Sequence, residues 1–276
     1  MSQNSPKAIY IHGSTPIEQE RLSALNRILN DQYIKALSLQ EGEKILDVGS
    51  GLGQFSQLLA EKTGENGRVI GIERDEAQLN QANSLVLNRK NTVNIEYRKG
   101  NAYQLPLRDK EWGQFDIVHA RFLLEHLSKP QKAIRQMIKA IRPGGRIILA
   151  DDDHSTFRPT PEPPGFSIIW KAYCRSYERL GNDPYIGRHL VSLLYRSGIT
   201  KYKNGSVFFG GCKGEEKFEL VADNLTGILE GARALILEEG LLDKYSFETA
   251  IKNLKYWKTL PDAALNYSID WVEGIK

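Results

Sequence analysis

The sequence predicts an α/β protein built on a doubly wound sheet. Short apolar segments typical of strands alternate with segments of helical periodicity from about residue 43 to residue 150. A glycine-rich turn follows the first of these strands. The 276 residues exceed the length of an average domain, yet they also fit one α/β unit with additions. We therefore expect a mostly parallel sheet covered by helices on both faces.

Residues 1–40 are expected to form a helical cap. Thr15 is a candidate N-cap, Pro16 fits the first helical position, and Glu18 completes a capping box. Apolar residues then recur at helical spacing at Leu22, Leu25, Leu29 and Tyr33. The first residues lack a basic region followed by an apolar stretch, so no secretory signal is expected.

Residues 41–154 are expected to form the core of the fold. Strands are predicted at 44–48, 67–73, 93–98, 115–120 and 146–150. Helices are expected from Phe55, over residues 75–88, and from about Pro130. Arg142-Pro143-Gly144-Gly145 predicts a turn before the fifth strand. This alternation is typical of a Rossmann-like sheet.

The remaining residues, 155–276, are expected to add two strands and several helices. Four prolines between residues 159 and 164 predict a loop, because neither a helix interior nor a central strand accepts them. Helical patterns occupy about 166–180, 184–197 and 215–258, and strands are expected at 203–210 and 264–272. The sheet would then have seven strands, with helical insertions.

The composition narrows the class of protein. Hydrophobic residues make up 41% and charged residues 26%, which excludes a disordered or fibrous chain. Acidic and basic residues alternate and the formal charge is only +3, so nucleic acid is not the expected partner. No apolar run approaches the roughly 20 residues of a membrane span. Two cysteines, Cys174 and Cys212, are too few for a disulfide framework, and we expect a cytoplasmic protein.

The glycine turn and two later strand ends predict a nucleoside site. Gly49, Gly51 and Gly53 have the spacing G-x-G-x-G, which is neither the dinucleotide fingerprint nor a phosphate loop. Glu73 ends the second strand, where a carboxylate can accept both hydroxyls of a ribose. Gly100-Asn101-Ala102 follows the third strand and offers an amide to a purine edge. Together they suggest adenosine contacts without a phosphate clamp.

Several ordered motifs carry a resemblance to a known family. They are Ile45-Leu46-Asp47-Val48-Gly49-Ser50-Gly51-Leu52-Gly53, Val69-Ile70-Gly71-Ile72-Glu73, Gly100-Asn101-Ala102, Phe115-Asp116-Ile117-Val118, Leu123-Leu124-Glu125-His126-Leu127 and Arg142-Pro143-Gly144-Gly145. The segment of about 110 residues that contains them resembles the core of class I S-adenosylmethionine-dependent methyltransferases. It is most similar to the small-molecule branch that includes the ubiquinone and menaquinone C-methyltransferases.

The resemblance implies a set of cofactor-binding residues. Asp47, Gly49, Ser50 and Gly51 would line the methionine part of S-adenosylmethionine, and Glu73 with Arg74 would hold the ribose. Asn101 and Ala102 would contact the adenine, although the family often has an acid in place of Asn101. Arg121 would contact the cofactor or the substrate, or else form a surface ion pair. The N-terminal helix would close over the cofactor near Tyr10 and Gly13, whereas Tyr33 fits a core position better.

Catalytic residues are harder to predict, because the sulfonium methyl group is already activated and the protein mainly positions the nucleophile. His126 is the candidate general base, and the alternative is that it orients the following loop. Asp151-Asp152-Asp153-His154 resembles a set of metal ligands, but successive side chains diverge, so no metal is assigned. Aromatic walls for a partly apolar substrate are expected from Trp170, Tyr173, Tyr177, Phe208 and Phe209.

The sequence thus predicts an S-adenosylmethionine-dependent methyltransferase that transfers a methyl group to a small molecule by direct in-line displacement. Three alternatives stay open: a nucleotide-dependent oxidoreductase on a Rossmann-like sheet, a methyltransferase acting on RNA or protein, and a binding module without turnover. The sequence fixes neither the acceptor atom nor the oligomeric state.

Overall fold

The structure is a computed structural model that describes residue 27 and residues 29–87 and 94–276. The chain divides into two compact units. The larger unit consists of the described residues up to Phe157 together with Tyr177–Phe209 and Asn266–Lys276, and the smaller unit consists of Arg158–Ser176 and Gly210–Leu265. Each is described by itself. The predicted division at residues 40 and 154 stays a prediction.

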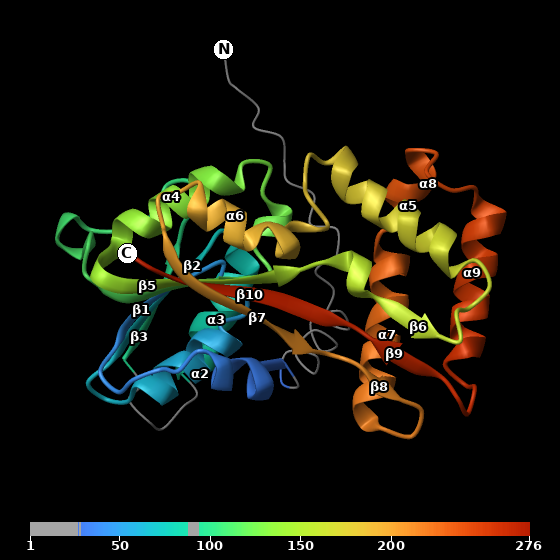
Figure 1. Cartoon of the computed structure of the whole chain (residues 1–276), viewed down its shortest axis with the longest axis horizontal. Helices are drawn as coiled ribbons and strands as arrows, with labels where there is room; N and C mark the ends of the chain where they lie inside the picture. The colour runs from blue at the N-terminus through green and yellow to red at the C-terminus, as the bar shows by residue number, and fades with distance from the viewer. Residues whose placement is uncertain (1–26, 28, 88–93) are drawn as a thin grey trace, which may run out of the picture. The chain divides into compact units, whose positions relative to one another are not determined.

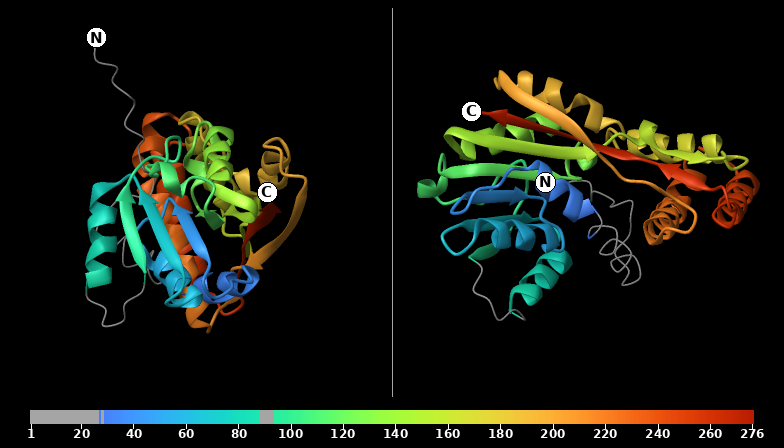
Figure 2. Two further views of the ribbon diagram at one scale, coloured as in Figure 1. Left: turned by 90° about the vertical axis from the view of Figure 1, so that its left-hand side faces the viewer. Right: turned by 60° about the horizontal axis from the view of Figure 1, so that its bottom comes forward.

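The larger unit is built on a seven-stranded sheet with the order β3-β2-β1-β4-β5-β10-β7. The strands are β1 (Lys44–Val48), β2 (Arg68–Glu73), β3 (Ile95–Lys99), β4 (Phe115–Arg121), β5 (Ile141–Asp152), β7 (Lys201–Phe208) and β10 (Ser268–Ile275). The first five pair in parallel, whereas β10 is antiparallel to both β5 and β7. Figure 2 shows the twist of this sheet from two sides. The predicted seven-stranded, mostly parallel sheet is confirmed.

Helices cover both faces of the sheet, as predicted for a doubly wound fold. On one side, α2 (Gln54–Thr63) and α3 (Glu76–Leu87) pack on β2 and β3; on the other, α4 (Pro130–Ala140) and α6 (Leu190–Tyr195) pack on β5 (Figure 1). Short 3-10 turns complete this unit: η1 (Asp109–Glu111), η2 (Leu124–His126), η3 (His154–Thr156) and η4 (Ile186–His189). Residues 29–36 are also helical, while Thr15, Tyr10 and Gly13 lie outside the described residues.

The core of the larger unit lies where the helices meet the central strands. Leu46, Val118 and Ile147 are completely buried in one apolar cluster. Strands that are covered on both faces need apolar residues on both sides, which explains their continuous apolar runs in the sequence. In α4, the buried residues fall on one helical face at Ala133, Ile134, Met137 and Ala140.

Two predicted boundaries differ from the structure. The residues predicted as a turn, 142–145, lie inside β5, where the pairing jumps from Phe115–Ile141 to Ile117–Arg146. They form a bulge, because β5 uses more residues than β4 over this stretch. The predicted strand at 264–272 is interrupted at Tyr267, which separates β9 (Ala264–Asn266) from β10. The two parts pair in different sheets.

The smaller unit combines a three-stranded sheet with helices. Its strand order is β6-β9-β8, with β6 at Arg158–Thr160 and β8 at Gly211–Cys212. The proline-rich stretch predicted as a loop therefore begins with a three-residue edge strand, a position that tolerates proline. The helices are α5 (Phe166–Arg179), which begins in this unit, α7 (Glu216–Gly231), α8 (Arg233–Glu238) and α9 (Lys244–Trp257).

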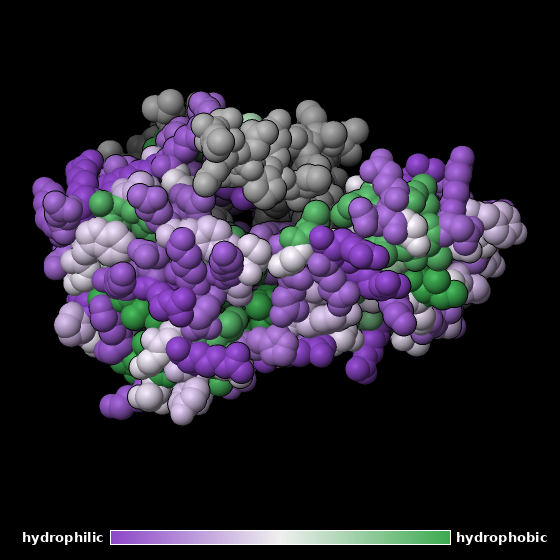
Figure 3. Space-filling view, turned by 90° about the horizontal axis from the view of Figure 1, so that it is seen from above, coloured by the Kyte–Doolittle hydropathy of each residue, from purple (hydrophilic) through white to green (hydrophobic). Residues whose placement is uncertain are grey.

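The surface is polar over most of the face seen in Figure 3, and hydrophobic residues appear between the hydrophilic ones as separate areas. Across the part of the chain that the structure describes, no helix combines the length and the apolar character that crossing a membrane requires.

Candidate active site

The turn between β1 and α2 is locked against the neighbouring strands. The amides of Gly49 and Ser50 donate to the carbonyl oxygen of Ile72, at 2.8 and 3.0 Å. Gly53 has a φ of +77°, and a Cβ at this position would lie only 2.4 Å from the hydroxyl oxygen of Tyr97. Since L side chains rarely adopt this conformation and none would fit, the turn requires glycine at residue 53.

Glu73, at the carboxyl end of β2, is oriented by backbone amides. Its Oε2 accepts from the amide of Gly51 at 2.9 Å, and its Oε1 accepts from those of Arg74 and Asp75 at 2.7 and 2.8 Å. These bonds fix the direction of the carboxylate next to the glycine turn. Within the described residues, the buried hydroxyl oxygen of Ser50 has no hydrogen-bond partner.

The loop after β3 lies next to Glu73. The amide of Gly100 donates to the carbonyl oxygen of Glu73 at 2.9 Å. Asn101 uses its side-chain oxygen to accept from the amide of Tyr103 at 2.9 Å, which closes a tight turn. Ala102 in this turn is buried. The carboxamide of Asn101 therefore shapes the loop that follows β3.

A buried polar chain runs behind the glycine turn. Asp47 in β1 accepts from Ser56 Oγ at 2.5 Å through one oxygen, and its other oxygen lies 2.8 Å from His119 Nδ1. The other ring nitrogen of His119 lies 3.2 Å from the hydroxyl of Tyr33. All four side chains are almost completely buried. Both oxygens of Asp47 are thus engaged by protein groups, which fixes β1 against β4.

Arg121 ends β4 beside this chain. Its guanidinium carbon lies 4.2 Å from the ring centroid of Phe55 and 5.6 Å from that of Tyr33. Burial lowers the pKa of Arg121 to about 10, so the side chain keeps its positive charge near neutral pH.

Three buried carboxyl groups lie at the ends of β4 and β5. Burial raises the pKa values of Glu125, Asp151 and Asp152, and repulsion from neighbouring carboxyl groups raises them further. Asp151 Oδ2 accepts from the amide of Leu124 at 2.8 Å, so β5 holds the η2 turn that carries Glu125. The carboxyl groups of this cluster therefore hold their protons more tightly than exposed ones do.

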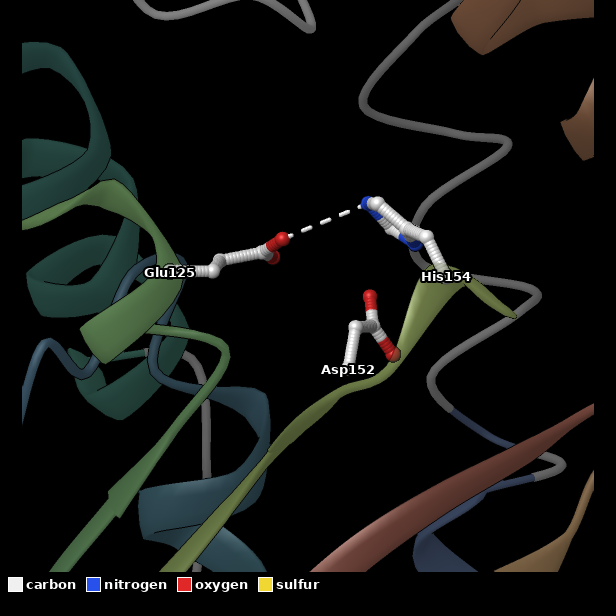
Figure 4. Close-up of side chains that lie close together, drawn as sticks. All are labelled: Glu125, Asp152 and His154. Carbon is white, nitrogen blue, oxygen red and sulfur yellow. Dashed lines mark ion pairs between the residues drawn. The ribbon is translucent and has the colours of Figure 1, made fainter. Parts of the chain in front are cut away.

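Two histidines border Glu125 on either side. His126 Nε2 lies 3.4 Å from Glu125 Oε1, and His154 Nε2 lies 3.5 Å from Glu125 Oε2. The ring of Tyr177 stacks on His126 with centroids 5.9 Å apart and meets His154 edge-on at 5.4 Å. Glu125 and His154 point toward one another in Figure 4, with Asp152 beneath them at the end of β5.

Comparison with known proteins identifies this arrangement. A family model described as a methyltransferase domain matches residues 39–178, which is 140 of the 276 residues. The chain belongs to the methyltransferase-domain family. This domain uses S-adenosylmethionine, and the resemblance seen in the sequence motifs is confirmed.

Curated relatives match the methyltransferase domain over part of their length. An uncharacterised 37.1 kDa protein in a transposon of Streptomyces fradiae is 30% identical over 60% of this chain and 46% of its own. The ubiquinone/menaquinone biosynthesis C-methyltransferase of Cronobacter sakazakii is 27% identical over 49% of this chain and 53% of its own. The chain therefore spans about half the length of these relatives.

Solved structures agree on the fold of the methyltransferase domain. The YcgJ protein of Bacillus subtilis superimposes with a TM-score of 0.59 and 17% identity, over 91% of this chain and 98% of its own. At this identity the likeness supports the α/β architecture alone.

The predicted site residues of the methyltransferase domain gather at the carboxyl edge of the parallel strands. Glycine-turn residues and Glu73 are joined by hydrogen bonds, and the Asn101 loop adjoins Glu73. Arg121 is the last residue of β4, and His126 lies in the η2 turn that follows this strand. Their roles stay predictions, as do those of Asp47, Arg74 and Ala102.

The aromatic residues predicted to form the substrate walls differ in burial and in ring contacts, and each is described within its own unit. Tyr177 stacks on His126, Phe209 packs near Tyr267 with centroids 6.0 Å apart, and the side chain of Phe208 is exposed. Within α5, Trp170 stacks on Tyr173 at 5.0 Å. Their role as substrate walls also stays a prediction.

Sequence reasoning does not find two residues of the larger unit, His119 and Tyr267. His119 lies inside an apolar strand, where a polar residue signals a buried hydrogen-bonding partner. The link from Tyr267 to Asp152, whose side chains form a hydrogen bond, carries no local signal because the residues are far apart in the sequence.

Proposed function

We propose that the protein transfers the methyl group of S-adenosylmethionine to a small molecule. One observation carries the proposal: in a chain of this family, the Glu73 carboxylate is held by three backbone amides beside the glycine turn. Among the described residues, the Gly51 amide donates to Oε2 of Glu73, and this oxygen has a lone pair for a further donor. A ribose hydroxyl is such a donor.

The residues present fit the cofactor. Glu73 would hold the ribose, and the backbone of residues 49–51 would lie along the methionine part, where the Ser50 hydroxyl has an open hydrogen-bonding capacity. A side chain at Gly49 would collide with Leu123, since a Cβ there lies 3.0 Å from Leu123 Cδ1. The Asn101 loop would border the adenine. Asp47 would act by fixing β1 rather than by direct contact, because both of its oxygens are engaged.

The bound cofactor supplies an activated methyl group on a sulfonium. The protein's own task is to place the acceptor in line with that group, to exclude water and to remove a proton where the acceptor carries one. His126 is the base we propose, because the neighbouring Glu125 carboxyl, 3.4 Å from Nε2, would stabilise the protonated imidazole. The stacked ring of Tyr177 would keep the imidazole in this orientation.

A small acceptor is favoured over a macromolecule by the weak formal charge of +3 and by the relatives. The Cronobacter enzyme is named for ubiquinone and menaquinone biosynthesis. Nucleic-acid binding normally depends on concentrated positive charge. We propose a partly apolar acceptor.

Calorimetry with S-adenosylhomocysteine tests the cofactor assignment. Wild type should bind about one molecule per chain, and the double variant Gly49→Arg, Glu73→Ala should not bind measurably. The matched control is Glu76→Ala, because Glu76 is a neighbouring carboxylate that is exposed and forms a surface ion pair with Lys99. Failure of wild type to bind, or equal binding by the double variant, would contradict the proposal, and NAD(P) binding in its place would indicate an oxidoreductase.

Labelled methyl transfer tests the acceptor class. The protein is incubated with methyl-labelled S-adenosylmethionine and fractionated cell extract. Label in the small-molecule fraction supports the proposal, whereas label confined to RNA or protein contradicts it. His126→Asn should lower kcat roughly 10²-fold or more without changing the affinity for S-adenosylhomocysteine.

A further inference from the structure

Two carboxyl groups and an imidazole that could bind a metal ion lie close together after β4 and β5. One donor atom from each of Glu125, Asp152 and His154 lies within 4.8 Å of the others. Asp152 ends β5 and His154 begins η3, two residues later, while Glu125 comes from η2. Alternate residues of an extended segment point the same way, so Asp152 and His154 face Glu125 together (Figure 4).

Two of these groups lack the hydrogen bonds that burial normally demands. Glu125 is only 2% exposed, and no residue in the described part of the chain donates a hydrogen bond to its Oε2. Over the same residues, Oδ1 of Asp152 is also buried without a hydrogen-bond partner. A buried carboxyl oxygen without a donor is costly, and a cation bound to it removes that cost.

Three carboxyl groups gather around this point. Glu125, Asp151 and the Oδ1 atom of Asp152 are all buried, and Arg121 is a positive group that acts on Asp152. Asp153 is engaged elsewhere, because Arg188 donates to it through two bonds of 2.7 Å. A divalent cation binds such carboxyl groups in their ionised form and supplies the positive charge that burial otherwise withholds from them.

The spacing fits a small metal ion. Ligand atoms at about 2.0–2.2 Å from a tetrahedral zinc lie roughly 3.4 Å apart. Glu125 Oε2 and His154 Nε2 are separated by 3.5 Å, which matches this spacing, and one ligand atom of Asp152 lies within 4.8 Å of the other two ligand atoms. The Asp151 bond to the Leu124 amide would fix the Glu125 ligand from behind, as outer-shell groups do in metal sites.

We propose that Glu125, Asp152 and His154 bind one divalent transition-metal ion of the zinc type. Carboxylates alone would suit Mg²⁺ or Ca²⁺, whereas an imidazole among them favours a first-row transition ion. Three protein ligands leave a coordination position open for an oxygen atom of a small molecule. This site goes beyond the proposed methyl transfer and does not depend on it.

From the sequence alone, no metal is expected at residues 151–154, because the side chains of successive residues diverge. Asp151 and Asp153 do point away, toward Leu124 and Arg188. Asp152 and His154 share one side, and the third ligand comes from η2.

Zinc titration of the full chain tests the site. Tag-free protein is stripped with a chelator, titrated with Zn²⁺ in a calorimeter and dialysed for metal analysis. We expect wild type to bind about one Zn²⁺ per chain. Each of the variants Glu125→Gln, Asp152→Asn and His154→Gln should raise the dissociation constant for Zn²⁺ at least tenfold. The control is His189→Gln, because His189 is an exposed histidine 3.9 Å from an aspartate and should not affect binding. Each variant must also bind S-adenosylhomocysteine like wild type, which shows that it is folded.

Three results would overturn the site: no saturable binding by wild type below roughly 100 µM Zn²⁺, binding unchanged in all three ligand variants, or binding lost in His189→Gln. Wild type that binds S-adenosylhomocysteine but no zinc would refute the metal site alone. Wild type that binds zinc but no S-adenosylhomocysteine would refute the proposed function alone.

Discussion

Glu73 and Glu125 are two carboxyl groups at the same edge of one sheet, yet their surroundings differ. Glu73 accepts three backbone hydrogen bonds, which orient its side chain. Glu125 is buried, has raised pKa and faces two histidines at 3.4 and 3.5 Å without a hydrogen bond to Oε2 in the described residues. Glu73 is therefore oriented to accept a hydrogen bond from a ligand, whereas the surroundings of Glu125 favour the binding of a cation.

The carboxyl groups near β3 and those near β5 also differ in whether a cationic side chain binds them. On the β3 side, the guanidinium of Arg98 binds both oxygens of Glu111 at 2.7 and 2.8 Å. On the β5 side, Asp151 and Asp152 are buried next to Glu125, and their charges repel one another. Carboxylates near β3 should therefore stabilise the fold, whereas those near β5 should not. Four measurements test this difference.

The largest effect is expected from Arg98→Met. The substitution removes the guanidinium that binds both oxygens of Glu111, whose side chain is 8% exposed. The carboxylate then keeps the Arg108 amide at 2.8 Å and the more distant Arg68 at 3.7 Å. The free energy of unfolding in urea should fall by about 3 kcal/mol. The adjacent control Lys99→Met breaks only an exposed pair with Glu76 and should cost less than about 1 kcal/mol. Equal losses in the two variants would remove the contrast.

Acid should remove the contribution of Glu111. The hydrogen bonds from Arg98 lower the pKa of Glu111 from 4.5 to about 2. Because the pKa is lowered on folding, the stabilisation is complete above pH 4.5 and is lost as the pH falls toward 2. It amounts to at most about 3 kcal/mol. Unfolding free energies measured across this range should fall less steeply in Glu111→Gln, and parallel curves would contradict the assignment.

Glu73→Gln should weaken S-adenosylhomocysteine binding by about 10- to 100-fold, or roughly 1.4 to 2.7 kcal/mol. The amide carries no charge, and its NH₂ group would face backbone donors that the carboxylate now accepts from. Calorimetry measures the loss. Glu76→Gln, the exposed neighbour on α3, should bind like wild type, and a loss of the same size there would show a general charge effect.

The smallest effect is expected from Glu125→Gln in metal-free protein. Glutamine replaces a buried carboxyl group whose Oε2 accepts no hydrogen bond from the described residues, so the unfolding free energy should stay within about 1 kcal/mol of wild type. Urea unfolding without and with Zn²⁺ separates the two roles, because added zinc should stabilise wild type more than the variant. If the unfolding free energy of metal-free Glu125→Gln fell by more than about 2 kcal/mol, the Glu125 side chain would have to make stabilising contacts in the protein, and the contrast would be wrong.

The parts of the fold that follow from local pattern were predictable. Each central strand is a short apolar run, and the glycine turn is marked by its own residues, so the sheet and the neighbourhood of Glu73 could be inferred from the sequence. The bulge at residues 142–145 and the interruption at Tyr267 were not predicted, because they depend on which distant strand each segment meets.

The acidic cluster could be predicted only in part. The string Asp151-Asp152-Asp153-His154 is visible, but which members face inward depends on the bond from Asp151 to Leu124 and on the ion pair from Asp153 to Arg188. Those partners lie 27 and 35 residues away. Local periodicity carries no information about contacts of this range.

The place of β10 has a consequence for the order of assembly during synthesis. β10 lies between β5 and β7, so β7 is made on the ribosome before the strand that joins it to the sheet. Until β10 emerges, β5 presents an open edge and β7 has no neighbour in the sheet. Such edges recruit other chains, so nascent chains that stall within α9 would be the ones most in need of a chaperone.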